Sequence, residues 1–420
     1  MANADKCITE DTEIVGYAQV ANDRSLAKTM TEIREGPKAL QYIPKTTSNA
    51  VGKDFPEVEE KPFVCEKEKM DMLVTTVYRT ADTAPWEYNG VYRPDPNDPL
   101  AKYVNEVRIE FHDNKVNQGD NLPGRVFLDL KEPTRLDQVI VDLNDTMVGV
   151  DKNGTVKPKW TDKNKPQTTQ PQPTTFRVVP TVDTSKRVTL PAGTNAIPFE
   201  IQVPKGAIPT FNYVSPKDGA SVVNSYSAEG VTRLNGKTAR TDRVTVDVKG
   251  LGDTQGGLGF NDANNEVAIA KKYVKKGTGI DYGLGQKKDS DQKKNDDVEA
   301  SVVQHVRCPP VGINDTTTLK PDLKPSKSSK SSSSVINNYN EDPTNTSKLP
   351  NDNLSNVFEQ ENAPVKADLP SITTKDFESN YKLKLKGGDA AYEAPFALVD
   401  DLKQGWRPTH LTQPTSIRRA

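Results

Sequence analysis

Three histidines are the side chains best suited to acid–base chemistry near neutral pH: His112, His305 and His410. A catalytic histidine needs a nucleophile or a metal ion within reach. His112 is followed by Asp113, but the chain has neither a Gly-x-Ser-x-Gly nor a His-Glu-x-x-His sequence. We therefore expect His112 to be a surface-turn residue, and we expect no catalytic residues and no enzyme activity.

Two other segments have the composition of ligand sites. Asp142, Asn144, Asp145 and Asp151 form an acidic cluster, but a calcium site needs six or more oxygen ligands at ordered spacing. We expect solvated turn residues there and no bound metal. The glycine-rich stretch at 250–259, GLGDTQGGLG, lacks the Gly-x-Gly-x-x-Gly spacing of a dinucleotide-binding loop. It predicts a flexible segment and no cofactor.

Cysteine use and charge restrict the cellular setting. Cys7, Cys65 and Cys308 lie far apart, without metal-ligand spacing and without a disulfide framework. The first residues lack the basic and apolar regions of a signal peptide, and no run of about 18 apolar residues is present. The formal net charge of -2 does not favour a nucleic-acid partner. We expect a cytoplasmic protein that is peripheral to a membrane at most.

The elements available to position a site are strands. Hydrophobic residues make up 34% of the chain, below the roughly 45–50% usual for globular domains. This composition predicts one folded domain with long disordered flanks. Inside that domain, Leu122, Gly124, Val126, Leu128 and Leu130 fall on one side of an alternating segment. A period of two residues is typical of a strand with one buried face.

Further short segments of this kind predict an antiparallel, all-β, two-sheet sandwich of the arrestin or immunoglobulin type over residues 101–250. Nothing in the chain alternates helix with strand, so a parallel α/β fold is not expected. The predicted strands lie at 105–111, 122–130, 136–143, 176–179, 188–190, 198–203, 222–231 and 244–248. Pro198 and Pro204 are expected to begin and end one of them, because proline cannot donate to a ladder.

The flanks are more polar. Residues 1–100 are expected to be a mixed segment, partly disordered, with a short helix near 25–35 and a strand near 72–78. Residues 251–420 are expected to be a largely disordered, low-complexity tail with short apolar islands, and 315–365 in particular are rich in Ser, Lys, Asn and Pro.

Two motifs resemble the N-terminal domain of arrestins and arrestin-domain proteins. The first is VNQGDNLPGRVFLDL at 116–130, preceded by VRIEF and followed by LDQVIVDL. The second is LPAGTNAIPFEIQVPKGAIPTF at 190–211, followed by NSYSAEG. The resemblance covers about residues 105–250. Full arrestins have a second sandwich after this point, where the present chain becomes charged and glycine-rich.

The resemblance implies a non-catalytic adaptor that binds cytosolic tails of membrane proteins, acidic or phosphorylated ones included. Basic residues near the strand edges are the candidates for contacts with phosphate, because arginine and lysine bind it as a fork and as a point charge. These candidates are Lys102, Arg108, Lys115, Arg177, Lys186 and Arg187. The alternative for each is a side chain that only solvates a sheet and protects its edge.

A second class of function also fits the sequence. The sandwich would then be the building block of a structural or assembly protein. An adaptor is expected to be monomeric or dimeric in solution, whereas a building block is expected to form large assemblies. The sequence contains no Pro-Pro-x-Tyr motif, by which many arrestin-domain proteins recruit ubiquitin ligases.

Overall fold

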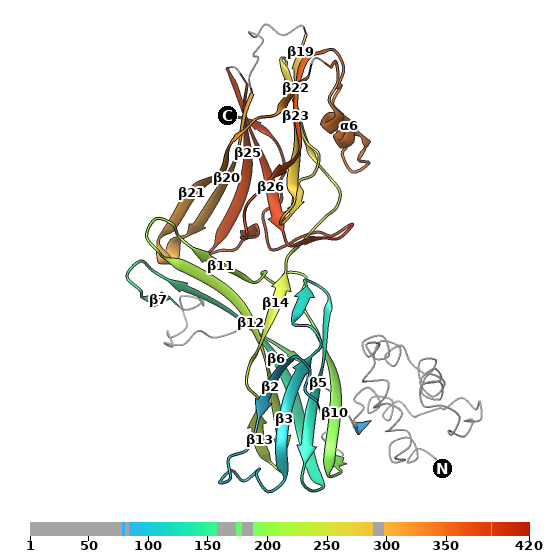
Figure 1. The fold of residues 1–420 in the computed structure, drawn as a ribbon, viewed down its shortest axis with the longest axis vertical. Helices are drawn as coiled ribbons and strands as arrows, with labels where there is room; N and C mark the ends of the chain where they lie inside the picture. The colour runs from blue at the N-terminus through green and yellow to red at the C-terminus, as the bar shows by residue number, and fades with distance from the viewer. Residues whose placement is uncertain are drawn as a thin grey trace, which may run out of the picture.

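A computed structural model of the chain describes residues 78–79, 84–157, 174–178, 188–288, 298–328, 330–387 and 389–420. The predicted helix at 25–35 and most of the predicted strand at 72–78 lie outside these residues. The described part is mostly β-strand, with one α-helix, α6 (Ser334–Glu341), and one short 3-10 helix, η1 (Pro309–Val311). The all-β prediction is therefore confirmed. The strands form two units, 78–250 and 251–420, placed end to end (Figure 1).

Two sheets build the first unit. One has the order β1-β10-β5-β3-β2, and the other has the order β4-β14-β12-β6-β7, with β8, β9, β11 and β13 paired to β6 or β12. Each strand predicted between 105 and 250 is present. The strands are β1 (Tyr78–Arg79), β2 (Tyr88–Tyr92), β3 (Val104–Phe111), β4 (Lys115–Asn117), β5 (Asn121–Leu130), β6 (Thr134–Val150), β7 (Val156–Lys157), β8 (Thr174–Val178), β9 (Val188–Leu190), β10 (Gly193–Gln202), β11 (Phe211–Val214), β12 (Ser221–Leu234), β13 (Lys237–Arg240) and β14 (Val244–Lys249).

The apolar faces of these two sheets share one cluster of buried side chains. Gly124 of β5 lies opposite Phe199 of β10, and a Cβ on Gly124 would overlap the Phe199 ring. The ring fills this space and meets Phe111 edge-on, with ring centroids 5.6 Å apart. The glycine therefore allows a close approach of ring to backbone. The residues predicted to be buried are buried: Val126, Leu128, Phe199 and Ile201.

Pro198 does not begin a strand, contrary to our prediction. It lies inside β10, opposite Arg125 of β5. The other edge of β10 pairs with β1 only at Asn195 and Ala196. On that side, the described residues that pair with β10 therefore do not reach Pro198. A strand tolerates proline at an edge where no hydrogen bond to a neighbouring strand is needed.

Residues 251–420 fold into a second pair of sheets, which contradicts our prediction of a largely disordered tail. The sheet orders are β16-β17-β19-β23-β22 and β18-β26-β25-β20-β21, with β24 and β28 added to the latter. The strands are β15 (Leu251–Gly252), β16 (Leu258–Asn261), β17 (Asn265–Ile269), β18 (Tyr273–Lys275), β19 (Gly279–Lys287), β20 (Val298–Cys308), β21 (Ile313–Leu323), β22 (Ser326–Ser328), β23 (Leu354–Pro364), β24 (Ile372–Thr373), β25 (Glu378–Gly387), β26 (Ala390–Val399), β27 (Asp401–Leu402) and β28 (Arg418–Arg419).

The second core is formed by strands in which apolar and polar residues alternate, rather than by continuous apolar runs. In β25, Tyr381, Leu383 and Leu385 are buried, and the lysines between them are exposed. A strand of this kind has a low average hydrophobicity although one of its faces is wholly apolar. The prediction of disorder at 315–365 fails for the same reason, because this range contains most of β21 together with β22, α6 and β23.

The glycine-rich stretch at 250–259 contributes β15 and the start of β16, and residues 253–257 form the loop between them. Gly257 and Gly259 lie under Tyr339 of α6. A Cβ at these positions would come within 2.8 Å and 2.7 Å of the Tyr339 side chain. The glycines therefore leave room for the helix, which covers the outer side of the sheet that contains β19 and β23 (Figure 1).

The turn between β4 and β5 connects the two units. The buried side chain of Gln118 accepts a hydrogen bond of 2.9 Å from the backbone N–H of Leu251, the first residue of the second unit. Gly119 has a positive φ of 77° and lies beneath Trp406, whose ring would be 2.7 Å from a Cβ at this position. The glycine is needed here for both its backbone conformation and its lack of a side chain.

Candidate protein-docking surface

The residues considered for catalysis do not assemble into a reactive site. His112 is exposed and stacks on Trp86, with ring centroids 3.7 Å apart. His305 lies 3.3 Å from the side chain of Asn314. Cys308 is a buried free thiol, and burial raises its pKa to about 11, so it is not a thiolate at neutral pH. In the described part of the chain, no three His, Cys, Asp or Glu side chains gather in a way that could hold a metal ion.

The acidic cluster does not form the solvated turn that the sequence predicts. Asp142, Asn144 and Asp145 lie within the 17-residue strand β6, and the last two are buried. Consecutive strand residues point to opposite faces, so Asn144 and Asp145 are separated by the sheet. Asp151 alone lies in a turn, where its carboxylate accepts hydrogen bonds of 2.9 Å from the N–H groups of Asn153 and Thr155.

Arg108 is not available for contacts with phosphate at the surface, which corrects our prediction. Its side chain is 8% exposed and is held between Glu106 and Glu110, with 2.7 Å between its Nε and the Glu110 carboxylate. Glu110 also pairs with the fully buried Arg125 at 2.5 Å. The guanidinium of Arg125 lies 4.0 Å from the ring centre of Trp86. The four charged residues therefore form a buried network on the outer face of β3 and β5.

Of the other basic candidates, Lys102 and Lys115 are the ones whose side chains the structure describes, and they are not brought together. Lys102 and Lys115 are exposed, but they lie before and after β3, at opposite ends of that strand. Arg177 lies opposite Asp142 in the pairing of β8 with β6. Lys186 and Arg187 lie outside the described residues. Both edges of β3 are paired, one to β2 and the other to β5, so a bound tail cannot add to this strand.

Exposed apolar side chains point to a different surface. Within the described ranges, the large hydrophobic residues that are exposed are Val156 (57%), Val214 (56%) and Val223 (36%). They come from β7, β11 and β12, which join β6 in one sheet. Residues directly opposite one another in a sheet share a face. Pairing across the strands therefore shows whether the three valines lie together.

The register places them on one face. Val156 lies opposite Val150, Val150 lies opposite Ser221, and Ser221 lies opposite Val214. In the next row of the same face, Asn212, Val223 and Val148 lie opposite one another. Val148 and Val150 are half-buried. We call these five residues the valine face: Val148, Val150, Val156, Val214 and Val223.

The other side of this sheet is packed against the second unit. Met147, Phe211 and Val222 belong to a buried cluster with side chains of the second unit, and Phe211 stacks on Phe377 with ring centroids 4.6 Å apart. Tyr213 donates a hydrogen bond of 2.7 Å to Asp315 beside this cluster. One side of the sheet is thus fixed by the second unit, and the valine face is its opposite side. The ends of β7, β11 and β12 project beside the junction of the units in Figure 1.

Sequence reasoning missed the valine face. The nearest local signal is the pair Val222-Val223, because adjacent apolar residues in a strand place one side chain on each face. The five valines come together through the pairing of strands that are distant in the sequence.

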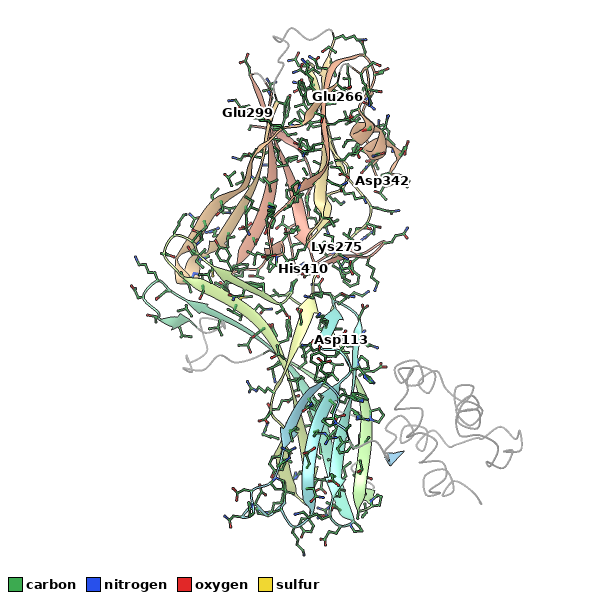
Figure 2. The ribbon with its side chains drawn as sticks, in the orientation of Figure 1. Asp113, Glu266, Lys275, Glu299, Asp342 and His410 are labelled. Atoms are coloured by element: carbon green, nitrogen blue, oxygen red, sulfur yellow. The ribbon has the colours of Figure 1, made fainter. Side chains whose placement is uncertain are left out.

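A buried histidine lies where the two units meet (Figure 2). His410 is 3% exposed, and burial lowers its pKa to about 4. Between about pH 6.5 and pH 4, the unfolded chain binds a proton at His410 that the folded chain does not bind. The free energy of unfolding should therefore decrease as the pH is lowered through this range, by up to about 3 kcal/mol. His410→Leu should remove this part of the pH dependence.

Denaturant melts of both proteins at several pH values between 7 and 4 measure this effect. The difference in unfolding free energy between the wild-type protein and the variant should shift in favour of the variant as the pH falls. Curves that stay parallel over this range would contradict a neutral, buried His410.

Comparison with known proteins adds no assignment: no family model matches this chain, and neither does any curated protein. The residues that the structure describes contain no helix of the length and apolar character needed to cross a membrane.

Proposed function

We propose that the chain is a non-catalytic adaptor with two arrestin-like β-sandwiches, which binds an extended, partly aliphatic segment of a membrane-protein tail on the valine face. The sandwich type is supported by the shared core of the first two sheets. A second pair of sheets with its own core follows at 251, where full arrestins have their second sandwich. Both observations strengthen the resemblance of residues 105–250.

The valine face is the observation on which the binding proposal rests. Exposed apolar patches on a folded surface mark sites of interaction with other proteins. The side chains that the register places on this face between the valines, Asn212 and Ser221, carry no charge. A stable dimer buries roughly 800 Å² per partner, which five valines do not supply. The patch therefore fits a short segment that binds weakly and reversibly.

Replacing Val223 with aspartate should weaken tail binding at least about tenfold, because an unpaired carboxylate would be buried against an aliphatic segment. Thr245→Asp is the matched control, since Thr245 is exposed on β14 of the same sheet system. Fluorescence anisotropy with labelled tail peptides and the full chain measures both affinities. Equal weakening by the two variants, or none by Val223→Asp, would refute binding at the valine face.

Recognition of phosphate is a separate part of the proposal. It is supported by the exposure of two of the basic candidates, Lys102 and Lys115. Phosphorylated peptides should bind more tightly than unphosphorylated ones. Lys115→Ala should reduce this difference in affinity, and Lys102→Ala makes the same test at the other end of β3. If both forms of the peptide bind with equal affinity, the adaptor does not read phosphate through these residues.

The alternative is a building block of a larger assembly. Sizing chromatography of the full chain separates the two functions. A monomer or dimer supports the adaptor, and a large homogeneous assembly supports the building block. If Val223→Asp dissociates such an assembly, the valine face is a contact between copies of this chain.

A further inference from the structure

A run of serines and lysines leads into the helix of the second unit. From Ser326 to Ser334, the only residues that are not serine are Lys327 and Lys330. Lys327, Lys330 and Ser331 are exposed, and Ser334, the first residue of α6, is half-buried. In the sequence, the run joins β22 to α6.

One carboxylate binds both serines at the start of α6. Oε2 of Glu359, on β23, accepts a hydrogen bond of 2.8 Å from the Ser333 hydroxyl and two of 3.0 Å from Ser334, one from its N–H and one from its hydroxyl. Ser333 is the N-cap, and its oxygen accepts from the N–H of Ile336 at 3.3 Å. Asn351 also holds this end of the helix, since its side chain accepts a hydrogen bond of 2.7 Å from the N–H of Ser333 and donates one of 2.8 Å to the Ser333 carbonyl oxygen. The two serine donors and Asn351 therefore attach the start of α6 together.

The helix covers an apolar area of the sheet. Ile336 and Tyr339 pack in a small buried cluster with Ala268 of β17 and Leu349. Gly283 of β19 lies under Ser333, whose Oγ would be 2.8 Å from a Cβ at this position. If the start of α6 moved away, this area would be uncovered. Asp342, the residue after α6, lies at the C-terminal end of the helix and is labelled in Figure 2.

We propose that Ser334 is a phosphorylation site and that its phosphate releases α6 from the sheet. A protein kinase would transfer the terminal phosphoryl group of a nucleoside triphosphate. The Ser334 Oγ–P bond forms, the bond from phosphorus to the leaving diphosphate breaks, and the hydroxyl proton passes to the kinase. The lysines before the serines match an enzyme with preference for basic residues on the N-terminal side of its target.

The release follows from charge. Phosphorylation removes the hydroxyl donor that binds Glu359 and attaches a group with nearly two negative charges to the oxygen that lies 3.0 Å from the Glu359 carboxylate, and like charges this near repel. A phosphate on Ser331 would act differently. The helix dipole favours a negative charge near the start of α6 in both cases. The phosphate of Ser334, however, would lie against the Glu359 carboxylate that its hydroxyl binds, whereas that of Ser331 would precede the N-cap beside Lys330. The position of the phosphate therefore decides whether α6 is released or held.

Treatment of the full chain with a basic-directed serine kinase and ATP tests the site, with tandem mass spectrometry to locate the phosphate. Hydrogen exchange of the amides of α6 should accelerate at least about tenfold in the phosphorylated protein, and that of β3 should not change. Ser334→Ala should abolish the acceleration. Phosphate confined to Ser331 or Ser332, or unchanged exchange in α6 with Ser334 phosphorylated, would overturn the proposal.

Two further variants test the mechanism without a kinase. Ser334→Glu should accelerate exchange in α6, because it places a carboxylate beside Glu359. Glu359→Gln removes the charge with little change of shape, so the acceleration caused by Ser334→Glu should be smaller in that background. If both backgrounds respond equally to Ser334→Glu, repulsion by Glu359 is not the cause of release.

Discussion

Replacing Glu110 with alanine should lower the free energy of unfolding by about 3–5 kcal/mol, because it removes a buried carboxylate that pairs with two buried guanidinium groups. Glu110 is fully buried and lies between Arg108 and Arg125, at 2.7 Å from the first and 2.5 Å from the second. Arg125 is likewise fully buried. The remaining guanidinium groups would stay in a site with little access to water.

Denaturant melts of the full chain measure this effect, with two variants for comparison. Glu110→Gln retains the length of the side chain and should lower the free energy of unfolding nearly as much as Glu110→Ala. This comparison separates the effect of the charge from the effect of packing. Arg240→Ala breaks an exposed ion pair, since Arg240 lies 3.3 Å from Glu229 and its side chain is 63% exposed. It should cost roughly 1 kcal/mol or less. Similar losses for Glu110→Ala and Arg240→Ala would show that the network is accessible to water.

Phe199→Ala should also lower the free energy of unfolding by about 3–5 kcal/mol, the usual range for a large aromatic core residue. The ring is 3% exposed, contacts Phe111 edge-on, and occupies the space above Gly124. Its removal leaves a cavity between the two sheets of the first unit. A loss below about 1 kcal/mol would mean that the site collapses or that the ring is exposed.

Gly124 provides a second test of the same packing. Gly124→Ala should destabilise the wild-type protein, because the added Cβ would overlap the Phe199 ring and lie 2.7 Å from the Glu110 carbonyl oxygen. The cost of Gly124→Ala should be smaller in the Phe199→Ala background, where the ring is absent and the clash with the carbonyl remains. Strictly additive losses in a double-mutant cycle would show that Gly124 and Phe199 do not interact.

Some of the buried network was visible in the sequence. Glu106, Arg108 and Glu110 are spaced by two residues within the first predicted strand, so they must share one face of it. Opposite charges at that spacing favour pairing along the strand over contact with an external phosphate. The contribution of Arg125 was not visible, because it depends on the register between β3 and β5.

Local pattern predicted β3, β5, β8, β9, β10, β12, β14 and part of β6, because the alternation of apolar and polar residues along a strand does not depend on how the sheet is arranged. It missed β2, β4, β7, β11 and β13 and the second half of β6. The average composition concealed the second unit, since strands such as β25 carry as many lysines as apolar residues. Which outer faces are covered depends on tertiary contacts alone. The valine face requires the pairing of β6, β7, β11 and β12, and the packing of α6 requires a sheet built from segments up to about a hundred residues apart, so neither follows from local pattern.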